Sequence, residues 1–229
     1  MLQLYWAGYA LGYFGSAQGL FWLGAALELA VPVWAEPHEG TPWHGHHIAE
    51  RYGLFTIIVL GESVLASTMA VIHAAESAEH LPSLVLIAVT ALVIVAAMWW
   101  IYFAVPQHGL ITDLRAGVLW GYGHFLVFLS AAAIAPGIEV ALQFATHEVS
   151  LDATRAALTY TVPAALYVLM VWLLILRRLL GGAVNVIMPA GAVLILASAV
   201  GPYSLQVTGA LMAGLVMVTA VSARTGREA

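Results

Sequence analysis

The stretch HHIAERYGLFTIIVLGES, residues 46–63, places an arginine at the start of an apolar run and a glutamate well inside it. In a helix, which rises about 1.5 Å per residue, Glu62 lies about 16 Å beyond Arg51 along the axis. Of the whole chain, 62% is hydrophobic and only 8% is charged, against about 25% charged residues in a typical soluble domain. The pattern therefore predicts a membrane helix with Arg51 near one surface and Glu62 near the middle of the bilayer.

Apolar stretches of this kind recur along the 229 residues, and each is about long enough to cross a hydrocarbon core about 30 Å thick. They predict an all-α fold, a polytopic transmembrane helix bundle of about seven spans in a single transmembrane domain, residues 1–229. The first span is long enough for a tilt or a kink near its glycines, and a polar loop, residues 32–50, follows it. The predicted spans are residues 4–31, 52–72, 83–104, 116–137, 156–176, 185–201 and 204–222.

The arginines indicate the orientation of the bundle. With seven spans, Arg155 lies on one side of the membrane and the other six arginines lie on the opposite side. Loops rich in arginine stay in the cytoplasm, so we expect the N-terminus outside and the C-terminus in the cytoplasm. The six arginines are Arg51, Arg115, Arg177, Arg178, Arg224 and Arg227.

Two residue types are missing from the sequence, and their absence excludes several functions. The chain has no cysteine, which excludes disulfides, thiolate metal sites and a cysteine nucleophile. It has no lysine, which excludes a retinal protein, because that chromophore is held as a lysine Schiff base. There is no basic surface for nucleic acid, so we expect the lipid bilayer as the main partner, and no cofactor.

Glu62 is the strongest candidate for a binding residue, because an ionisable side chain in hydrocarbon is costly and usually faces the interior of the bundle. It either binds a proton or a ligand, or it is hydrogen-bonded and holds two helices together. His124 lies about 13 Å beyond Arg115 along a helix, so it reaches a similar depth and is a candidate partner. The alternative for His124 is a core histidine bonded to a backbone carbonyl. Glu139, about four helical turns further on, is expected on the same face as His124.

A polar stripe leads towards Glu62 from the start of the same helix. His47, Arg51 and Glu62 share one helical face with Leu54 and Ile58. Two interpretations remain for the start of this helix: a cap with an interfacial anchor, or a gating ion pair or anion contact. The predicted ligand- or proton-binding residues are Glu62, His124, Arg51, Glu50, His47 and Glu139.

The candidates for metal ligands all lie in the predicted polar loop. Histidine nitrogens and a carboxylate suit zinc, but their spacing matches no standard zinc signature. The neighbouring His46 and His47 point in different directions on a helix, so at most one of them is expected to align with Glu50. We therefore favour solvated loop histidines and predict no metal site; the residues concerned are His44, His46, His47 and Glu50.

The string HIAERYGLFTIIVLGES resembles the signature of the bacterial low temperature requirement protein A (LtrA) family, in which His-x-x-Glu-Arg-aromatic-Gly leads into an apolar run ending in Gly-Glu. The resemblance implies a multi-pass protein of the bacterial cytoplasmic (inner) membrane, and it identifies no substrate. The family name records a cold-growth phenotype. The matching residues are His47, Glu50, Arg51, Gly53, Phe55, Gly61 and Glu62, with Tyr52 at the aromatic position, and later Trp99, Trp100, Gly123, His124, Gly137, Ile138 and Glu139.

Members of that family usually have a longer N-terminal half with an acidic, phenylalanine-rich helix of its own. Nothing in this chain resembles that half, so the chain is similar to the C-terminal part of the family's proteins. We expect either a short member or a truncated gene product. In the second case, a site shared between the halves would be incomplete, or would be rebuilt in a homo-oligomer.

Two classes of function remain. The first is a proton-coupled or small-solute transporter or channel, in which Glu62 binds the cargo within the membrane with His124 or Arg51 nearby. The second is a non-transporting structural membrane protein that serves in cold or stress adaptation and locks its helices together through polar residues. A membrane enzyme acting on lipid headgroups would need a nucleophile or a second ligand cluster beside the histidines. The sequence has neither, so we do not expect an enzyme.

Overall fold

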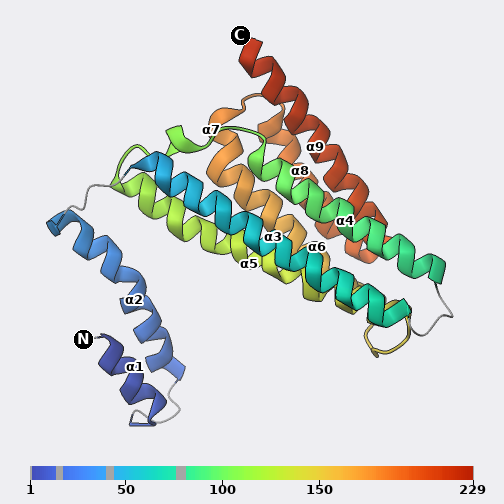
Figure 1. Cartoon of the computed structure of the whole chain (residues 1–229), viewed down its shortest axis with the longest axis horizontal. Helices are drawn as coiled ribbons and strands as arrows, with labels where there is room; N and C mark the ends of the chain where they lie inside the picture. Colours follow the sequence, from blue (N-terminus) through green and yellow to red (C-terminus); the bar gives the residue numbers. More distant parts are fainter. Residues whose placement is uncertain (1, 14–17, 40–43, 76–80, 229) are drawn as a thin grey trace. The chain divides into compact units, whose positions relative to one another are not determined.

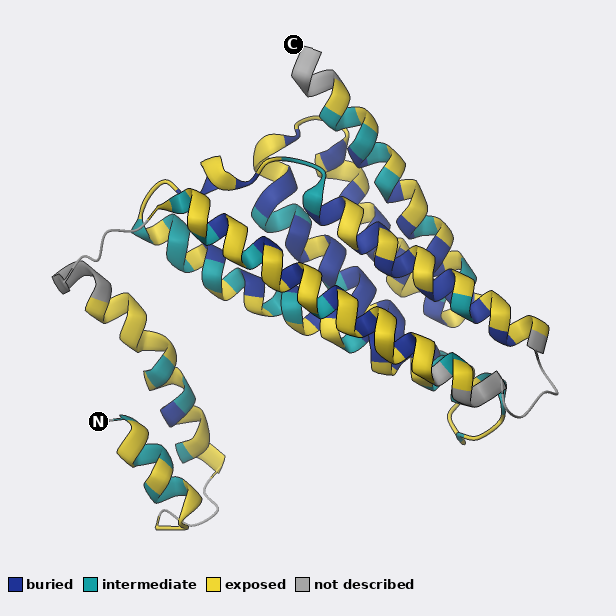
Figure 2. Ribbon diagram, viewed as in Figure 1, coloured by how far each residue is buried: buried dark blue, intermediate teal, exposed yellow. Residues whose placement is uncertain are grey.

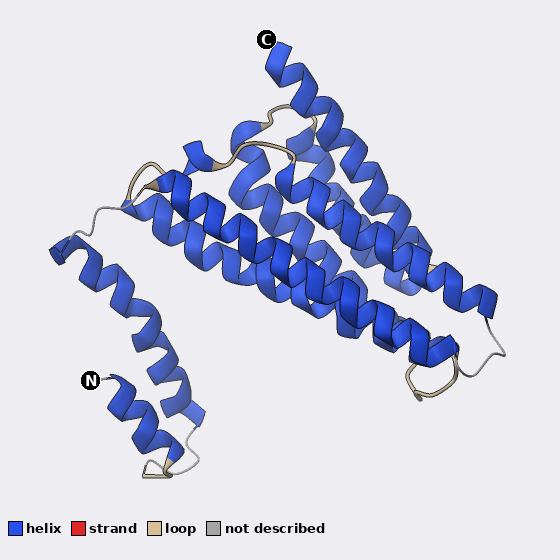
Figure 3. Ribbon diagram, viewed as in Figure 1, coloured by secondary structure: helices blue, strands red, loops and turns tan. Residues whose placement is uncertain are grey.

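A computed structural model describes residues 2–13, 18–39, 44–75 and 81–228, and every regular element in that part of the chain is helical (Figure 1, Figure 3). The prediction of an all-α fold is confirmed. The α-helices are α1 (Leu2–Ala10), α2 (Gln18–Glu39), α3 (Gly45–Ala75), α4 (Leu81–Phe103), α5 (Leu114–Ala145), α6 (Ala153–Val171), α7 (Arg177–Leu179), α8 (Val184–Ala197) and α9 (Ser204–Glu228). Shorter helical turns are η1 (His108–Leu110), η2 (Trp172–Leu176) and η3 (Ser198–Val200).

The chain divides into two compact units, Met1–His44 and Gly45–Ala229. In the first unit α1 lies against α2, where Trp6 donates a hydrogen bond from Nε1 to the carboxylate of Glu28 at 3.2 Å. Gly24 allows this close approach, because a Cβ atom there would lie 3.0 Å from the Trp6 ring. That the two units form a single transmembrane domain stays a prediction.

The predicted first span, residues 4–31, is wrong as one continuous helix. α1 ends at Ala10 and α2 begins at Gln18. Gly12 lies between them with φ +80°, in the left-handed region that glycine adopts readily and that commonly ends a helix. The helix of spanning length in this unit is Gln18–Ala35.

The predicted polar loop, residues 32–50, is also wrong, because most of it is helical. α2 continues through Pro32 to Glu39, and α3 already begins at Gly45. Proline is tolerated in membrane helices, where lipid offers the backbone no other hydrogen-bond partner. The polar residues at the start of α3 therefore belong to a helix that extends beyond its apolar segment.

In the second unit, α5 packs most extensively against α6 and also against α3 (Figure 1). α4 packs against α9, and α6 packs against α8. Large side chains such as Ile138 and Tyr167 are fully buried where helices meet, whereas large apolar side chains such as Leu54 and Phe125 are exposed on the outward sides (Figure 2). This distribution is the one expected of a bundle surrounded by lipid.

Aspartates set the starts of two long helices. The carboxylate of Asp113 accepts a hydrogen bond from the backbone at the start of α5, at 2.8 Å, and Asp152 does the same for α6, at 2.9 Å. Such N-caps satisfy backbone donors that have no partner within the helix. α5 then continues through Pro136 to Ala145, beyond the predicted span, which ends at residue 137.

Among the described residues, six helices are long and apolar enough to cross a membrane. The predicted span 185–201 corresponds to a shorter apolar helix, Val184–Val200. The orientation of the termini stays a prediction, and the side chain of Arg227 lies outside what the structure describes. The six helices are Gln18–Ala35, Gly45–Met69, Pro82–Phe103, Leu114–Ala145, Ala153–Leu179 and Ser204–Arg224.

Replacing Gly137 by alanine should lower the thermal unfolding temperature of the protein in detergent. A Cβ atom at this position of α5 would lie 2.5 Å from the backbone oxygen of Thr159 on α6. A backbone atom cannot rotate aside as a flexible side chain can, and overpacking of this kind costs about 1–3 kcal/mol. Unfolding followed by circular dichroism measures the change.

Gly117→Ala is the matched control, because Gly117 lies in the same helix and a Cβ atom there would meet the Ile111 side chain at an ordinary 3.8 Å. This variant should unfold at the wild-type temperature or slightly above it, because alanine favours the helix more than glycine does. Equal unfolding temperatures for the two variants would contradict the close approach of α5 and α6.

Candidate functional site

His124 on α5 is fully buried between helices of the second unit. Its Nδ1 lies 2.8 Å from the carbonyl oxygen of Trp120, and its Nε2 lies 2.9 Å from the hydroxyl of Tyr102 on α4. Because a carbonyl oxygen can only accept, Nδ1 carries the proton and donates, which leaves Nε2 to accept from the Tyr102 hydroxyl. Protein atoms thus satisfy both ring nitrogens of a neutral imidazole.

Aromatic rings enclose this histidine. The ring centroids of Trp120, Tyr52 and Phe128 lie 4.4, 4.9 and 5.6 Å from that of His124. Tyr52 comes from α3, and Gly121 makes room for its hydroxyl, since a Cβ atom at position 121 would lie 2.9 Å from that oxygen. The surroundings fit the core-histidine alternative better than a proton relay, which must exchange with water.

Glu62 lies near the middle of α3 and is exposed. α3 turns the next residue inward, and the buried hydroxyl of Ser63 donates to the carbonyl of Ala131 on α5 at 3.1 Å. On the exposed side, Glu62 has Ile58 and Leu65 as neighbours along the helix, both more than half exposed. Among the residues that the structure describes, Glu62 has no hydrogen-bond or ion-pair partner.

The structure does not bring Glu62 and His124 together, although both were expected at a similar depth. The carboxyl group is on the outside of α3, whereas the imidazole is enclosed in the core and its nitrogens bond other residues. Small hydroxyl side chains occupy the inner face of α3 instead. Thr56 and Ser63 are buried there, because each also bonds a carbonyl one turn back in its own helix, at 2.9 and 3.0 Å.

Glu139 on α5 is exposed, so the expectation that it shares a face with the buried His124 is wrong. At 3.6 residues per turn, the two positions are about 60° apart around the helix axis, and the edge of the buried face falls between them. The carboxylate of Glu139 accepts a hydrogen bond from Nε2 of Gln143 at 3.3 Å.

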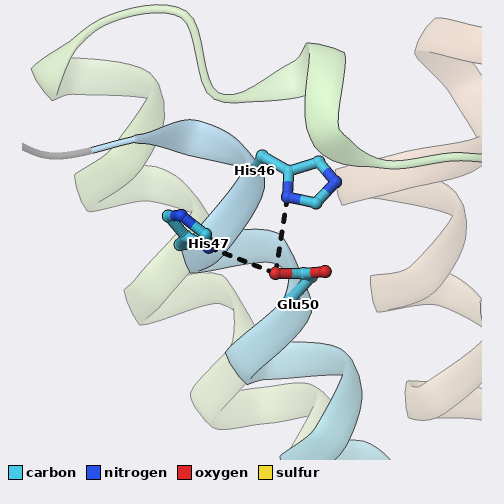
Figure 4. A group of neighbouring side chains, drawn as sticks. All are labelled: His46, His47 and Glu50. Atoms are coloured by element: carbon cyan, nitrogen blue, oxygen red, sulfur yellow. Dashed lines mark hydrogen bonds and ion pairs between the residues drawn. The ribbon is translucent and has the colours of Figure 1, made fainter.

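The first turns of α3 bring His46, His47 and Glu50 together (Figure 4). Oε2 of Glu50 lies 3.2 Å from Nδ1 of His47 and 3.4 Å from Nδ1 of His46. The expectation that at most one of the histidines aligns with Glu50 is therefore wrong. Residues three and four positions back are both neighbours on a helix, and the glutamate reaches between them. His44, the remaining candidate, belongs to the first unit.

These side chains border a pocket of about 790 Å³. Another wall is the segment after α4, which includes the buried Gln107 and the exposed His108. The ring centroids of His108 and His46 are 5.6 Å apart. Sequence reasoning missed His108. The predicted topology could have identified it. The connection after the predicted span 83–104 lies on the same side of the membrane as the start of the predicted span 52–72, so His108 and the histidines there are on one side.

Arg51 also lines this pocket, and the structure pairs Glu50 with the two histidines instead of with Arg51. Within the described residues, Arg51 forms no ion pair. Gln107 connects the pocket with the core: its Nε2 donates to the carbonyl of Tyr102 at 2.6 Å, and the Tyr102 hydroxyl bonds His124. Tyr102 thus contacts Gln107 through its backbone and His124 through its side chain.

The fold and the site define a multi-pass α-helical membrane protein with a pocket that histidine, glutamate and arginine side chains border at one end of its bundle, and with an exposed carboxyl on an apolar helix face. The family model described as Bacterial low temperature requirement A protein (LtrA) matches residues 1–223, nearly the whole chain. The chain therefore belongs to this family, as the resemblance predicted. Comparisons with curated proteins and with solved structures each found no match.

Replacing Tyr102 by phenylalanine should destabilise the bundle. The substitution removes the hydroxyl that bonds Nε2 of His124 and leaves a buried acceptor unsatisfied, which costs about 1–3 kcal/mol. The thermal unfolding temperature in detergent should fall. Tyr203→Phe is the control, because Tyr203 is exposed in the turn before α9 and should tolerate the loss of its hydroxyl. If Tyr102→Phe unfolds at the wild-type temperature, the Tyr102–His124 bond contributes nothing to stability.

Proposed function

We propose that this protein is a proton-coupled or small-solute transporter or channel, in which the carboxyl of Glu62 takes up and releases a proton within the membrane. The observation that carries the proposal is the exposure of Glu62 in the middle of a spanning helix, among apolar side chains. An ionisable group in hydrocarbon is costly, and in membrane proteins it marks a functional site by default.

The surroundings of Glu62 favour proton binding over a structural role. A glutamate that locks two helices would bond a neighbouring helix, and in the second unit this role belongs to hydroxyl groups. Ser63 bonds the carbonyl of Ala131, and Thr159 bonds the carbonyl of Gly137. Glu62 makes no such bond with a described residue, so its carboxyl can change protonation without breaking a helix contact.

In this proposal, the pocket at the start of α3 is the entrance for the proton or solute. It extends along the helix as far as Ile57, which is about 7.5 Å short of Glu62 along the axis. Its wall carries Arg51 and Glu50, which provide both signs of charge at the entrance. A proton or small polar solute that enters here then has to pass around α3, because Ile57 and Glu62 point about 140° apart on the helix.

We propose further that the pocket faces the cytoplasm and that the membrane is the bacterial inner membrane. Arg115 at the start of α5 and Arg177 in α7, which follows α6 through η2, lie at the same end of the bundle as Arg51, because successive long helices run in alternating directions (Figure 1). Positive charge gathered at one end of a bundle favours the cytoplasmic side for that end.

The test is proton flux into liposomes that contain the purified protein and a pH-sensitive dye, driven by a potassium diffusion potential. The wild type should change the internal pH faster than protein-free liposomes do. Glu62→Gln should lower the initial rate on the order of tenfold or more, because an amide cannot exchange a proton as a carboxyl does. Glu62→Asp keeps the carboxyl and should retain part of the rate.

Glu148→Gln is the matched control, because Glu148 is exposed in the connection after α5. It should move protons at the wild-type rate, and all variants should elute as folded protein with similar unfolding temperatures. Either of two results would overturn the proposal: a proton flux with the wild type that is no faster than in empty liposomes, or a proton flux with Glu62→Gln that equals that of the wild type.

The alternative is a non-transporting membrane protein in cold or stress adaptation. The enclosed His124, with both nitrogens bonded, favours this alternative, because such a core is built for stability. It predicts that Glu62→Gln changes the thermal unfolding temperature of the protein and that no variant changes the proton flux.

A further inference from the structure

We propose that His46, His47 and Glu50 form a binding site for a divalent transition metal ion such as Zn²⁺, with His108 as a fourth protein ligand. The site lies at the mouth of the pocket, at the start of α3 (Figure 4). It is distinct from the acid at Glu62, and it does not depend on the proposed transport of protons.

The distances between the ligand atoms suit a tetrahedral ion. With metal–ligand bonds of about 2.0–2.1 Å, neighbouring ligand atoms around tetrahedral zinc are about 3.3–3.4 Å apart. Oε2 of Glu50 lies 3.4 Å from Nδ1 of His46 and 3.2 Å from Nδ1 of His47. Each of the three residues offers a ligand atom within 4.8 Å of those of the other two, so a modest rotation of one exposed imidazole brings three ligand atoms to the spacing of a tetrahedral ion.

The kinds of ligand select the class of metal. Imidazole nitrogens together with one carboxylate suit Zn²⁺ and similar late transition metals, whereas Mg²⁺ and Ca²⁺ prefer sites built from oxygen alone. The cluster has two nitrogens for one carboxylate oxygen, so it differs from an ordinary group of acidic surface residues. Zinc is therefore the appropriate probe.

His108 adds a ligand from a second segment of the chain to the three ligands on α3. It comes from η1, in the connection between α4 and α5, and its ring centroid lies 5.6 Å from that of His46. A shared ion would join the start of α3 to that connection across the pocket. Arg51 lines the same pocket and opposes the charge of a cation, so we expect an ion that exchanges readily.

The experiment is zinc binding by the full chain in detergent. The protein is purified with a tag that contains no histidine, stripped with a chelator, and titrated with zinc chloride by calorimetry. The wild type should bind one Zn²⁺ per chain. His47→Gln and Glu50→Gln should each weaken binding by about tenfold or more, because each removes a ligand. His108→Gln should weaken it as well. Co²⁺, as a second probe, should give the strong visible absorption of a tetrahedral complex.

His147→Asn is the matched control. His147 lies after α5, at the other end of the bundle, with φ 60°, a backbone conformation that asparagine tolerates well. This variant should bind zinc as the wild type does. The three helical ligands are 55–73% exposed, so their substitution should leave the unfolding temperature unchanged.

Two results would overturn the proposal. One is a stripped wild type that binds no zinc. The other is wild-type affinity in His47→Gln and Glu50→Gln, which would place the bound ion elsewhere and leave these side chains as an ordinary hydrogen-bonded group. Wild-type affinity in His108→Gln alone would overturn the four-ligand site.

Discussion

Every backbone group inside a bilayer has to find its hydrogen-bond partner within the protein, because hydrocarbon offers none. Helices meet this requirement, and the hydroxyl side chains of the second unit follow the same rule. Thr56, Ser67 and Thr90 each donate to the carbonyl one turn back in their own helix, at 2.7 to 2.9 Å. Side chains satisfied in this way are buried at little cost, so they occupy the inner faces of α3 and α4.

The inward-facing polar side chains of α3, whose hydrogen bonds are all formed within the protein, set the rotation of the whole helix about its axis. Two residues of α3 contact α5: the Ser63 hydroxyl donates to the carbonyl of Ala131, and the Tyr52 ring fits against Gly121. With these contacts facing inward, Glu62 is turned outward. The same helix carries at its start the histidines and the glutamate that border the pocket. The rigid α3 thus positions both the membrane acid and the proposed metal ligands.

The lengths of the apolar runs predicted most of the helices, because crossing a bilayer requires about 20 residues of helix. The rotation of α3 could not be predicted in this way, since apolar residues lie on every side of it, from the buried Leu60 to the exposed Leu65. The rule that ionisable groups face the interior pointed to the wrong side for Glu62. Near Gly12 only a tilt or a kink was predicted and not a break, because glycine is also compatible with a continuous membrane helix. His108 required the tertiary arrangement that brings two connections together.

The central claim is that α3 turns Glu62 outward and Ser63 inward. The chain contains no cysteine, so a spin label can be attached at a single introduced cysteine, in Glu62→Cys or in Ser63→Cys. Electron paramagnetic resonance in liposomes then measures the mobility of each label and its collisions with dissolved oxygen. The account predicts a mobile, oxygen-accessible label at position 62 and an immobile, protected label at position 63. A protected label at position 62 together with an accessible one at position 63 would contradict it.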